Sequence, residues 1–311
     1  MDEPFVLVVN PRAGAGAAAR RTPALEAALT KRGARFVTRT TASPRDATRI
    51  VREVLASGAH AGVAVVGGDG TLSEAVNGFF DEEGAPIAPE AWLAPLPCGT
   101  GGDFRRTLGF PKDVDGMVER MLAARPRAID TGWVRFEGDE GAPDARAFLN
   151  IASFGLAGRV VRTVNAGPKW IGGPPAFLLG TFRAMLGYAN QRVRVTVDDA
   201  APRELSILNL AVANGRYFGG GMEVAPRALI DDGLFDVVAL EMTPVQSLRL
   251  TAAIYRGAHL GDARVWHARG SRITAAPARE TERVLLEIDG EAPGRLPATF
   301  ELRPGSLRLR A

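Results

Sequence analysis

The chain has 311 residues, which is enough for two domains of ordinary size. Its hydrophobic content of 46% and its charged content of 23% are ordinary for a globular protein and exclude a disordered or collagen-like chain. The single cysteine, Cys98, excludes an intramolecular disulfide framework and a multi-cysteine zinc site, and a formal net charge of +3 gives no reason to expect a nucleic-acid partner.

Apolar runs and helical patterns alternate through the first third of the chain. The runs are rich in β-branched residues and predict buried strands, and the segments between them carry apolar residues at helical spacing. The predicted strands span residues 5–9, 35–38, 62–66 and 92–96, and the predicted helices span residues 20–32, 45–57 and 71–80. Because continuous apolar strands separated by helices form parallel sheets covered on both faces, we expect an α/β domain with an open, mostly parallel sheet over residues 1–129.

The pattern changes from residue 130 onward. Short segments at 133–136, 192–197, 205–210 and 284–288 are rich in β formers, and several alternate apolar with polar residues. Such alternation is typical of antiparallel strands with one solvated face. We expect residues 130–299 to form a mostly β domain with one or two inserted helices, and residues 300–311 to pack back on the first domain.

A glycine-rich loop, Gly67-Gly68-Asp69-Gly70-Thr71, follows the third predicted strand and opens a helix. Glycines let the backbone approach a ligand closely, and the start of a helix offers unpaired N–H groups to a phosphate. An acidic residue such as Asp69 suits this position when magnesium accompanies the phosphate. The alternative is a plain strand-to-helix turn with Asp69 as the helix cap; the strand before and the helix after it favour phosphate binding.

Two further glycine loops follow the first and fourth predicted strands. Residues 14–19 formally fit a dinucleotide-binding pattern, but four residues separate them from the strand, and no acidic residue for a ribose ends the second strand. We therefore do not expect an NAD site of that type, and the chain has no P-loop motif. The other loop spans residues 97–104. Loops that follow parallel strands gather at one sheet edge, so we expect the three loops to converge.

The amino terminus lacks the basic start and long apolar core of a secretion signal. No uninterrupted run of 18 or more apolar residues could span a membrane. We therefore expect a cytoplasmic protein, with peripheral association at the inner face of the membrane if its substrate is a lipid.

The motifs and their order resemble the diacylglycerol kinase catalytic-domain family, which contains bacterial lipid kinases related to sphingosine and ceramide kinases. The resemblance covers nearly the whole chain, beginning with Asn10-Pro11-Arg12-Ala13-Gly14 and continuing through the two later glycine loops. Further matching segments are residues 129–132, 214–222, 229–234 and 289–291. Several motifs in the expected order are specific, whereas any one of them would not be.

This resemblance implies ATP bound between an α/β domain and an antiparallel β-sandwich, with the γ-phosphate passed to the hydroxyl of a lipid such as diacylglycerol. The first domain would then bind nucleotide and the second the lipid substrate. The implied ATP contacts are Asn10, Thr41, Gly67, Gly68, Asp69, Gly70, Thr71, Glu74 and Thr100. The implied ligands of catalytic magnesium, partly through water, are Asp69, Asp103 and Asp130, and those of a structural magnesium are Leu229, Asp232 and Leu234.

The general base implied by the resemblance is Glu291, which acts together with Asp69 in catalysis. Taken without the family, Glu291 would be read as a solvated hairpin carboxylate and Asp231-Asp232-Gly233 as a surface turn. One position departs from the family, because Gly102 stands where asparagine is common. Losing that amide removes hydrogen bonds near the phosphates, which motivates an alternative function as a catalytically weak lipid-binding or regulatory protein.

A second alternative is an NAD kinase, which shares the Gly-Gly-Asp-Gly loop, but its later Thr-Gly-Ser-Thr-Ala-Tyr signature is absent here. A lipid kinase must also meet a membrane surface. An apolar helical stretch over residues 169–188 could line an acyl-chain groove, dip into the bilayer surface or pack between the domains. We further expect a lipid substrate presented at a membrane, no nucleic-acid partner, and a possible homodimer.

Overall fold

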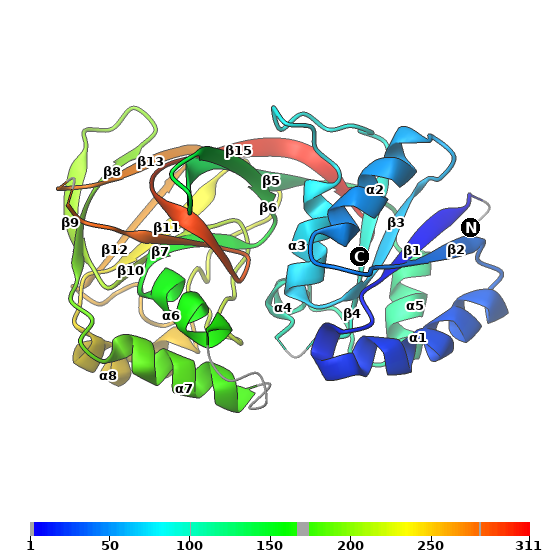
Figure 1. Cartoon of the computed structure of the whole chain (residues 1–311), viewed down its shortest axis with the longest axis horizontal. Helices are drawn as coiled ribbons and strands as arrows, with labels where there is room; N and C mark the ends of the chain where they lie inside the picture. Colours follow the sequence, from blue (N-terminus) through cyan, green and yellow to red (C-terminus); the bar gives the residue numbers. More distant parts are fainter. Residues whose placement is uncertain (1–2, 100, 167–173, 280) are drawn as a thin grey trace. The chain divides into compact units, whose positions relative to one another are not determined.

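The computed structural model describes residues 3–99, 101–166, 174–279 and 281–311. The chain divides into two compact units: unit 1 contains residues 1–131 and 304–311, and unit 2 contains residues 132–303. Figure 1 follows the chain through both by colour. The first unit is an α/β structure with a parallel sheet and the second an antiparallel β-sandwich, so the expected fold class is confirmed.

The sheet of unit 1 is parallel throughout. Its strands are β1 (Phe5–Val9), β2 (Phe36–Thr40), β3 (Gly62–Gly67) and β4 (Trp92–Pro97), and the last residues of β15 (Glu291–Leu309) pair with β4. The spatial order is β15-β4-β3-β1-β2. Every residue of β1 and β3 is buried, as continuous apolar runs require.

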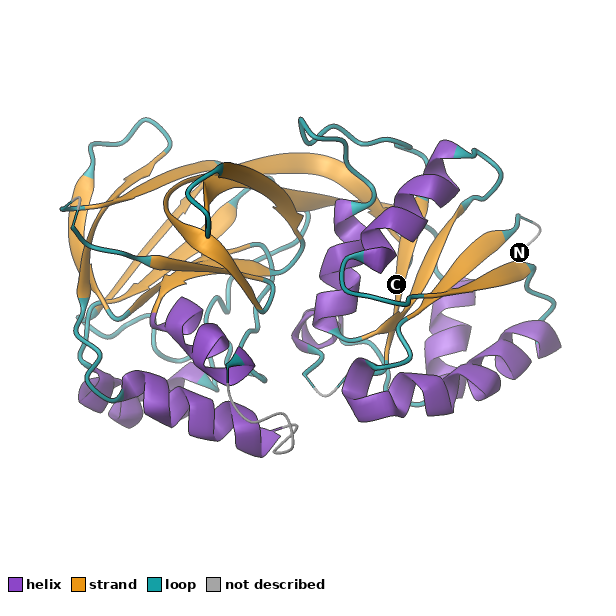
Figure 2. Cartoon of the chain, in the orientation of Figure 1, coloured by secondary structure: helices purple, strands orange, loops and turns teal. Residues whose placement is uncertain are grey.

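Helices cover both faces of this sheet (Figure 2). They are α1 (Ala13–Lys31), α2 (Asp46–Ala56), α3 (Asp69–Asn77), α4 (Asp103–Leu108) and α5 (Val114–Ala123). Leu25 of α1 and Met117 of α5 share one buried cluster with Phe5 and Trp92. Meanwhile α2 and α3 contact each other and the strands β1 and β3.

The beginning of α1 differs from the predicted helix, which started at residue 20. Residues Gly14, Ala15 and Gly16 have φ of 58°, 52° and 81°, so they lie in the left-handed region and the regular helix follows them. The alanine at this φ is unusual, because a side chain there meets the following carbonyl. The loop after β1 thus contains three consecutive residues in the left-handed conformation before the regular part of α1 begins.

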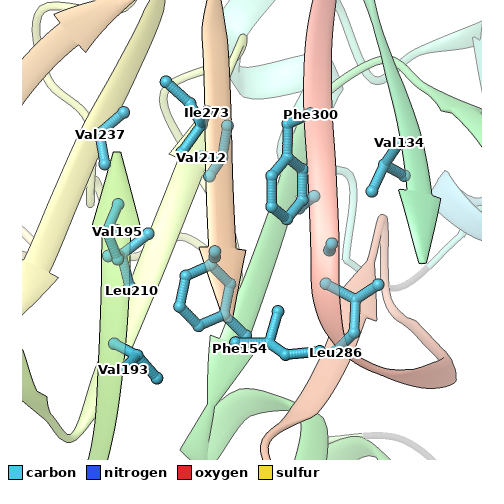
Figure 3. Close-up of a cluster of buried hydrophobic side chains, with 14 of the residues drawn as sticks. Val134, Phe154, Val193, Val195, Leu210, Val212, Val237, Ile273, Leu286 and Phe300 are labelled. Carbon is cyan, nitrogen blue, oxygen red and sulfur yellow. The ribbon is translucent and has the colours of Figure 1, made fainter. Parts of the chain in front are cut away.

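Unit 2 is an antiparallel β-sandwich. Its strands are β5 (Arg127–Gly138), β6 (Pro143–Phe148), β7 (Ile151–Gly155), β8 (Gln191–Val197), β9 (Arg203–Ile207), β10 (Asn209–Ala213), β11 (Phe235–Leu240), β12 (Val265–Gly270), β13 (Arg272–Pro277), β14 (Leu285–Ile288) and most of β15. One layer has the order β12-β11-β10-β7-β14, and β9-β8-β13 joins β15 in the other. Figure 3 shows the core between them, where Phe154 and Leu210 lie with Ile273 and Phe300.

The predicted strand over residues 205–210 is wrong in one respect, because it is two strands. β9 pairs with β8, whereas β10 pairs with β7 and β11, so the chain changes layers at Leu208. The backbone N–H of Leu208 donates to Leu240, and its carbonyl accepts from Leu156. Because the sequence is largely apolar on both sides of Leu208, it gives no sign of this change of layer.

Three helices of unit 2 are described, where one or two were expected: α6 (Leu156–Asn165), α7 (Pro174–Met185) and α8 (Pro244–Ile254). They pack on the outer face of the β7-β10-β11 layer through a second buried cluster that includes Val160, Ala184 and Ile254. None of the described helices is long and apolar enough to cross a bilayer.

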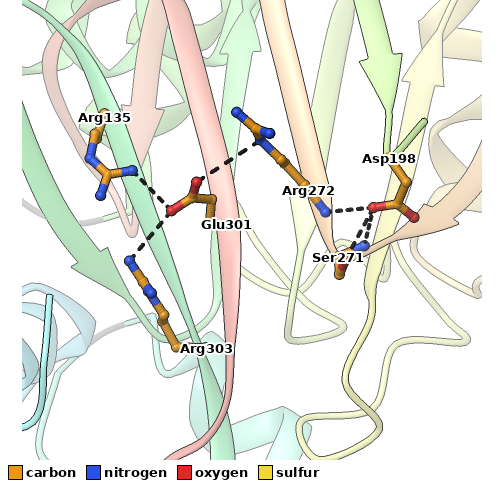
Figure 4. A network of polar contacts seen from close by, with 6 residues as sticks. All are labelled: Arg135, Asp198, Ser271, Arg272, Glu301 and Arg303. Carbon is orange, nitrogen blue, oxygen red and sulfur yellow. Dashed lines mark hydrogen bonds and ion pairs between the residues drawn. The ribbon is translucent and has the colours of Figure 1, made fainter. Parts of the chain in front are cut away.

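Charged side chains tie the other layer together at its surface (Figure 4). Glu301 of β15 pairs with Arg135 of β5 at 2.9 Å and with Arg303 at 3.4 Å. Asp198, which follows β8, accepts the backbone N–H groups of Ser271 and Arg272 at 2.9 and 2.8 Å. These contacts fix the turn between β12 and β13 against β8.

Candidate functional site

Three loops of unit 1 lie together where β1, β3 and β4 end. The backbone N–H of Asn10 donates to Val66, and that of Cys98 donates to Gly67 at 2.7 Å. The loops approach backbone to backbone: a Cβ added at Gly14 would lie 2.4 Å from the Cys98 carbonyl oxygen, and one added at Gly99 would lie 2.6 Å from Cα of Gly68. Glycine is therefore required at positions 14 and 99 for the loops to meet.

Two side chains hold these loops in register. The Asn10 amide donates to the Thr71 hydroxyl at 2.9 Å, which joins the loop after β1 to the start of α3. Asp69 Oδ2 accepts the backbone N–H groups of Gly102 and Asp103 at 2.8 and 3.1 Å, which joins the loop after β3 to the start of α4. The predicted ATP residues Gly67, Gly68, Asp69, Gly70 and Thr71 thus lie at the opening of α3, with Asn10 in contact.

The other two described ATP candidates lie beside the start of α2. Thr41 follows β2 and donates its backbone N–H to Val9 at 2.9 Å. The carbonyl of Glu74 accepts the Thr48 hydroxyl at 2.7 Å, and its carboxylate lies 3.4 Å from the Ala47 backbone nitrogen. Thr100, the remaining ATP candidate, lies outside the described residues.

Asp46 was not predicted, although it shapes the segment that carries Thr41. Its Oδ2 accepts the Ala42 backbone N–H at 2.8 Å, and its Oδ1 pairs with Arg49. These hydrogen bonds hold the pKa of the Asp46 carboxyl below its usual value, so the group is charged at neutral pH. An acidic residue in the first turn of an amphipathic helical pattern was a readable signal of a helix start.

The proposed catalytic magnesium ligands lie in different surroundings. Asp69 has one oxygen anchored by two N–H groups, and within the described residues its Oδ1 accepts no hydrogen bond. Asp103 is buried and pairs with Arg106 at 2.6 Å, and the buried Asp130 accepts the Gly305 backbone N–H at 2.8 Å. No group of three or more histidine, cysteine, aspartate or glutamate side chains in the described part of the chain could cage a metal ion.

Magnesium in phosphoryl-transfer sites keeps several waters and needs only one or two carboxylates together with substrate phosphates. Asp69 meets that requirement, because it is fixed in place and retains an oxygen for a hydrated cation. The fit to magnesium therefore rests on Asp69, at the start of α3, where the sequence predicts phosphate binding.

The loop predicted to hold a structural magnesium already surrounds a positive charge. Asp232 forms an ion pair with Arg269, and the same guanidinium lies 3.2 Å from Asp236. The other oxygen of Asp232 accepts the Leu234 backbone N–H at 3.2 Å. Both carboxylate oxygens of Asp232 are thus engaged by nitrogen donors in this arrangement, and the role of Leu229, Asp232 and Leu234 as ligands stays a prediction.

Glu291 is the first residue of β15, directly after a tight turn in unit 2. Asp289 and Gly290 in that turn have φ of 46° and 93°. The Asp289 carboxylate accepts three backbone N–H groups, from Leu149, Asn150 and Ile151, at 2.9–3.1 Å. The Gly290 N–H donates to Glu287 at 2.6 Å. The turn is therefore held rigidly, and it presents the half-exposed Glu291 side chain.

A second segment that carries the family resemblance, residues 214–222, lies against the same turn. The amide of Asn214 donates to the Leu149 carbonyl at 2.8 Å, and the amide of Asn150 donates to the Tyr217 carbonyl at 2.8 Å. The backbone N–H of Gly215 donates to Asn150 at 2.8 Å. The motif over residues 214–222 and the Asp289-Gly290-Glu291 motif are therefore neighbours within unit 2, although they are far apart in the sequence.

Arg146 is the residue of this group that sequence reasoning missed. Its Nη1 lies 3.0 Å from Glu291 Oε2, and its side chain is largely buried. An arginine in the middle of a polar strand carries no local signal of such a role. Only the pairing of distant segments reveals it.

Comparison with known proteins identifies the same two parts. Residues 4–134 match the diacylglycerol kinase catalytic domain, and residues 150–311 match the YegS C-terminal NAD kinase beta sandwich-like domain. A protein named "Probable lipid kinase YegS-like" from Pseudomonas aeruginosa (strain PAO1) is 32% identical over 310 residues, which covers 99% of this chain and 95% of the relative. The diacylglycerol kinase of Bacillus subtilis (strain 168) is 27% identical over 241 residues, covering 76% and 73%.

Solved structures share the fold over the whole chain. A diacylglycerol kinase from Bacillus anthracis str. Sterne aligns with a TM-score of 0.69 at 24% identity, covering 99% of this chain and 96% of that one. A yeast NADH kinase in complex with NADH aligns with a TM-score of 0.52 at 9% identity, covering 99% and 82%, which shows a common fold alone. From the two domain matches and the identity to lipid kinases, the chain belongs to the diacylglycerol kinase catalytic-domain family, together with the YegS-like lipid kinases.

Proposed function

We propose that the protein is an ATP-dependent lipid kinase, a phosphotransferase that moves the γ-phosphate of ATP to a hydroxyl of a lipid such as diacylglycerol. The observation that carries the proposal is the anchoring of Asp69 at the start of α3 by two N–H groups from the loop after β4. It brings a fixed carboxylate to a helix start whose free N–H groups suit phosphate oxygens. Membership of a lipid kinase family supports the same chemistry.

In this proposal unit 1 supplies phosphate binding. Phosphoryl transfer needs mainly positioning and neutralisation of charge, and little covalent chemistry from the protein. The backbone N–H groups at the start of α3 bind phosphate oxygens, and Asp69 holds hydrated magnesium. When bound, the metal offsets negative charge on the transferring phosphate. Asn10 keeps Thr71 in place through its hydrogen bond.

Unit 2 supplies the proton acceptor. Glu291 takes the proton of the lipid hydroxyl while the hydroxyl oxygen bonds to the γ-phosphorus. The bond from that phosphorus to the bridging oxygen breaks, so ADP leaves and the lipid becomes a phosphate monoester. The rigid turn held by Asp289 and the ion pair with Arg146 both orient this carboxylate. A base must lie within hydrogen-bond reach of its proton, which is why such orientation matters.

The test is incubation of the protein with labelled ATP, magnesium and a total lipid extract, followed by identification of the labelled product. We expect a labelled phospholipid. Replacement of Glu291 by alanine should lower its formation by about 100-fold or more while ATP binding persists. Glu301→Ala is the matched control, because it removes another arginine-paired carboxylate of β15.

Two other outcomes would reject the proposal. A soluble labelled product such as NADP would identify an NAD kinase. The yeast NADH kinase shares the fold of this chain at 9% sequence identity. Lipid binding without any consumption of ATP would identify a lipid-binding or regulatory protein, the function suggested by Gly102. Full activity of the Glu291→Ala variant would reject the base assignment alone.

A further inference from the structure

The side chain of Arg105 fills the space beside Gly102. Gly102 is buried and has φ of 68°, and a Cβ added to it would lie 3.2 Å from Nε of Arg105 and 3.7 and 3.8 Å from its Cβ and Cδ. Long side chains on a helix lie over the preceding turn, and this is the direction that Arg105 takes from α4. The Arg105 side chain therefore takes up room that a larger residue at position 102 would need.

This placement brings the Arg105 guanidinium close to the start of α3. The backbone N–H of Gly102, against which Arg105 packs, donates to Asp69 Oδ2 at 2.8 Å. Burial and the charge of Arg106 lower the pKa of Arg105, and the carboxylates of Asp69 and Asp103 offset part of that effect, so both carboxylates act on the guanidinium. A guanidinium stays protonated in proteins, so the positive charge near Asp69 is permanent.

The guanidinium also keeps hydrogen-bond donors for a ligand. Its Nη1 donates to the Phe110 carbonyl at 3.0 Å. Among the residues that the structure describes, the partly buried Arg105 forms no ion pair, and its Nε and Nη2 donate no hydrogen bond. The adjacent Arg106 differs, because it donates to the Gly101 carbonyl at 2.9 Å and pairs with Asp103 at 2.6 Å. Arg105 is thus a cation without a directly bound carboxylate, next to the loop that anchors the candidate magnesium ligand.

We propose that Arg105 donates from Nε and Nη2 to a phosphate oxygen of the bound nucleoside triphosphate and so supplies hydrogen bonds that Gly102 cannot. The proposal rests on the proposed function, which brings the phosphates of ATP to the start of α3. A guanidinium presents its donors in a planar fork that matches phosphate oxygens, and hydrogen bonds between charged groups are the stronger ones. The glycine at position 102 then does not weaken the site, because a charged donor reaches the phosphates from position 105.

Isothermal titration calorimetry with ATP and magnesium, in the absence of lipid, measures this contact on the full-length protein separately from catalysis. Arg105→Met should weaken ATP binding by about tenfold or more, because hydrogen bonds from a charged group are lost. Arg105→Lys should recover only part of the affinity, since an ammonium lacks the paired donors. The ATP affinity of the wild type should also fall more steeply with added KCl than that of Arg105→Met, because the variant lacks one screened charge.

Arg120→Met is the matched control for an effect on α4 itself. Arg120 donates to the carbonyls of Leu108 and Gly109 at 3.1 and 3.2 Å. These carbonyls adjoin that of Phe110, which accepts from Arg105. We expect Arg120→Met to change ATP affinity by less than about twofold. Equal weakening in Arg105→Met and Arg120→Met would overturn the proposal, because Arg105 would then act only by holding the end of α4.

A second substitution tests whether positions 102 and 105 serve the same ligand. In the Arg105→Met background, Gly102→Asn should restore ATP affinity to within about threefold of the wild type, because asparagine tolerates the left-handed φ and brings an amide donor. Gly102→Ala in that background adds a Cβ without a donor and should restore nothing. Equal restoration by alanine would show that filled space matters and would overturn the proposal.

The outcomes also separate this proposal from the proposed function. If Arg105→Met binds ATP as tightly as the wild type does, while the wild type phosphorylates lipid, the role of Arg105 is rejected and the kinase activity stands. If the wild type binds ATP and labels no lipid, the kinase activity is rejected, and the loss of ATP affinity in Arg105→Met still supports the phosphate contact. A wild type that binds no ATP would reject both.

Discussion

Arg146 Nη1 lies 3.0 Å from Glu291 Oε2, so the proposed base is paired with an arginine from a strand 145 residues earlier. Arg146 is 18% exposed and Glu291 is 46% exposed, so the guanidinium is the more firmly held partner. Asp144 lies 3.6 Å from the same arginine and completes its contacts on that side. In the proposed mechanism, Arg146 is therefore a positioning residue for Glu291.

Replacing Arg146 by methionine should lower kcat about tenfold and leave the KM for ATP unchanged, because the base loses its fixed orientation while nucleotide contacts stay intact. Arg146→Lys should recover part of kcat, since an ammonium can still reach the carboxylate. Steady-state kinetics measure both. Arg135→Met is the matched control, because Arg135 pairs with Glu301 at 2.9 Å on the same long strand. An equal effect in that control would show that Arg146 acts through general stability.

Asp69 has a structural role and a proposed metal-binding role, which two substitutions can distinguish. Asp69→Ala should lower the free energy of unfolding by about 1–3 kcal/mol, because the N–H groups of Gly102 and Asp103 lose their acceptor. Asp69→Asn keeps an acceptor and should unfold nearly like the wild type. Both variants should lose lipid phosphorylation by about 100-fold or more, since an amide holds hydrated magnesium poorly. Urea unfolding and the labelled-ATP assay measure the two effects, and magnesium-dependent turnover in Asp69→Asn would contradict the metal role.

The parts of the fold that the sequence predicted are those with strong local patterns. The strands at Phe5–Val9 and Gly62–Gly67 are continuous apolar runs, and helix α2 has apolar residues on one face. Each of these patterns predicts a single type of element. The layer change at Leu208 has no local signature, because the run stays apolar on both sides. Helix α8 did have one: Thr243 and Gln246 form a capping box, which was a readable start signal.

The candidate site likewise has parts that the sequence could predict and parts that it could not. The glycine loops could be recognised because close backbone approach excludes side chains, as at Gly14 and Gly99. The partners of Glu291 and Asp232 could not, because Arg146 and Arg269 reach them only through strand pairing between distant segments. Sequence motifs therefore predicted which groups are candidates for the chemistry, and tertiary structure was needed to find what holds them.

Substitutions of Gly102 test the one position at which the sequence departs from the family pattern, where asparagine is common. It precedes α4 with φ of 68° and ψ of 44°, a conformation that asparagine tolerates better than other side chains. A Cβ there would lie 3.2 Å from Nε of the flexible Arg105 side chain, which can move. We expect Gly102→Asn to fold normally and to lower the KM for ATP by about 2- to 10-fold, the effect of one added hydrogen bond. Gly102→Val should instead destabilise by about 1–2 kcal/mol, because a β-branched residue resists this φ. An unchanged KM in the asparagine variant would show that the missing amide is unimportant.

Arg269 should behave as a built-in cation for the loop after residue 228. Arg269→Met leaves Asp232 and the buried Asp236 without their guanidinium, so it should lower the free energy of unfolding by about 1.5–3 kcal/mol. His267 still donates to Asp236, which limits the loss. Adding magnesium should raise the Tm of this variant and not that of the wild type, because only the variant frees Asp232 for a metal. An equal rise in the wild type would show that removal of Arg269 opens no additional magnesium site.

His259 gives unit 2 a pH-dependent stability. The ring is buried, and its Nε2 lies 3.0 Å from the Val224 carbonyl oxygen, which can only accept a hydrogen bond, so the proton is on Nε2. Within the described residues, Nδ1 has no hydrogen-bond partner. Burial lowers the pKa of His259 below 6.5, and the hydrogen bond to Val224 and the charge of Glu223 offset only part of that effect.

The direction of the pH effect follows from that lowered pKa. As pH falls below 6.5, the unfolded chain binds a proton at this residue before the folded protein does. The stability that the neutral ring provides above pH 6.5 is therefore lost as the pH falls toward the lower pKa that His259 has in the folded protein. We expect urea midpoints of the wild type to fall through this range. His259→Gln keeps a donor for Val224 but cannot titrate, so its midpoint should change less with pH. Parallel curves for the two proteins would show that protonation of His259 does not contribute, because every other titrating group is common to both.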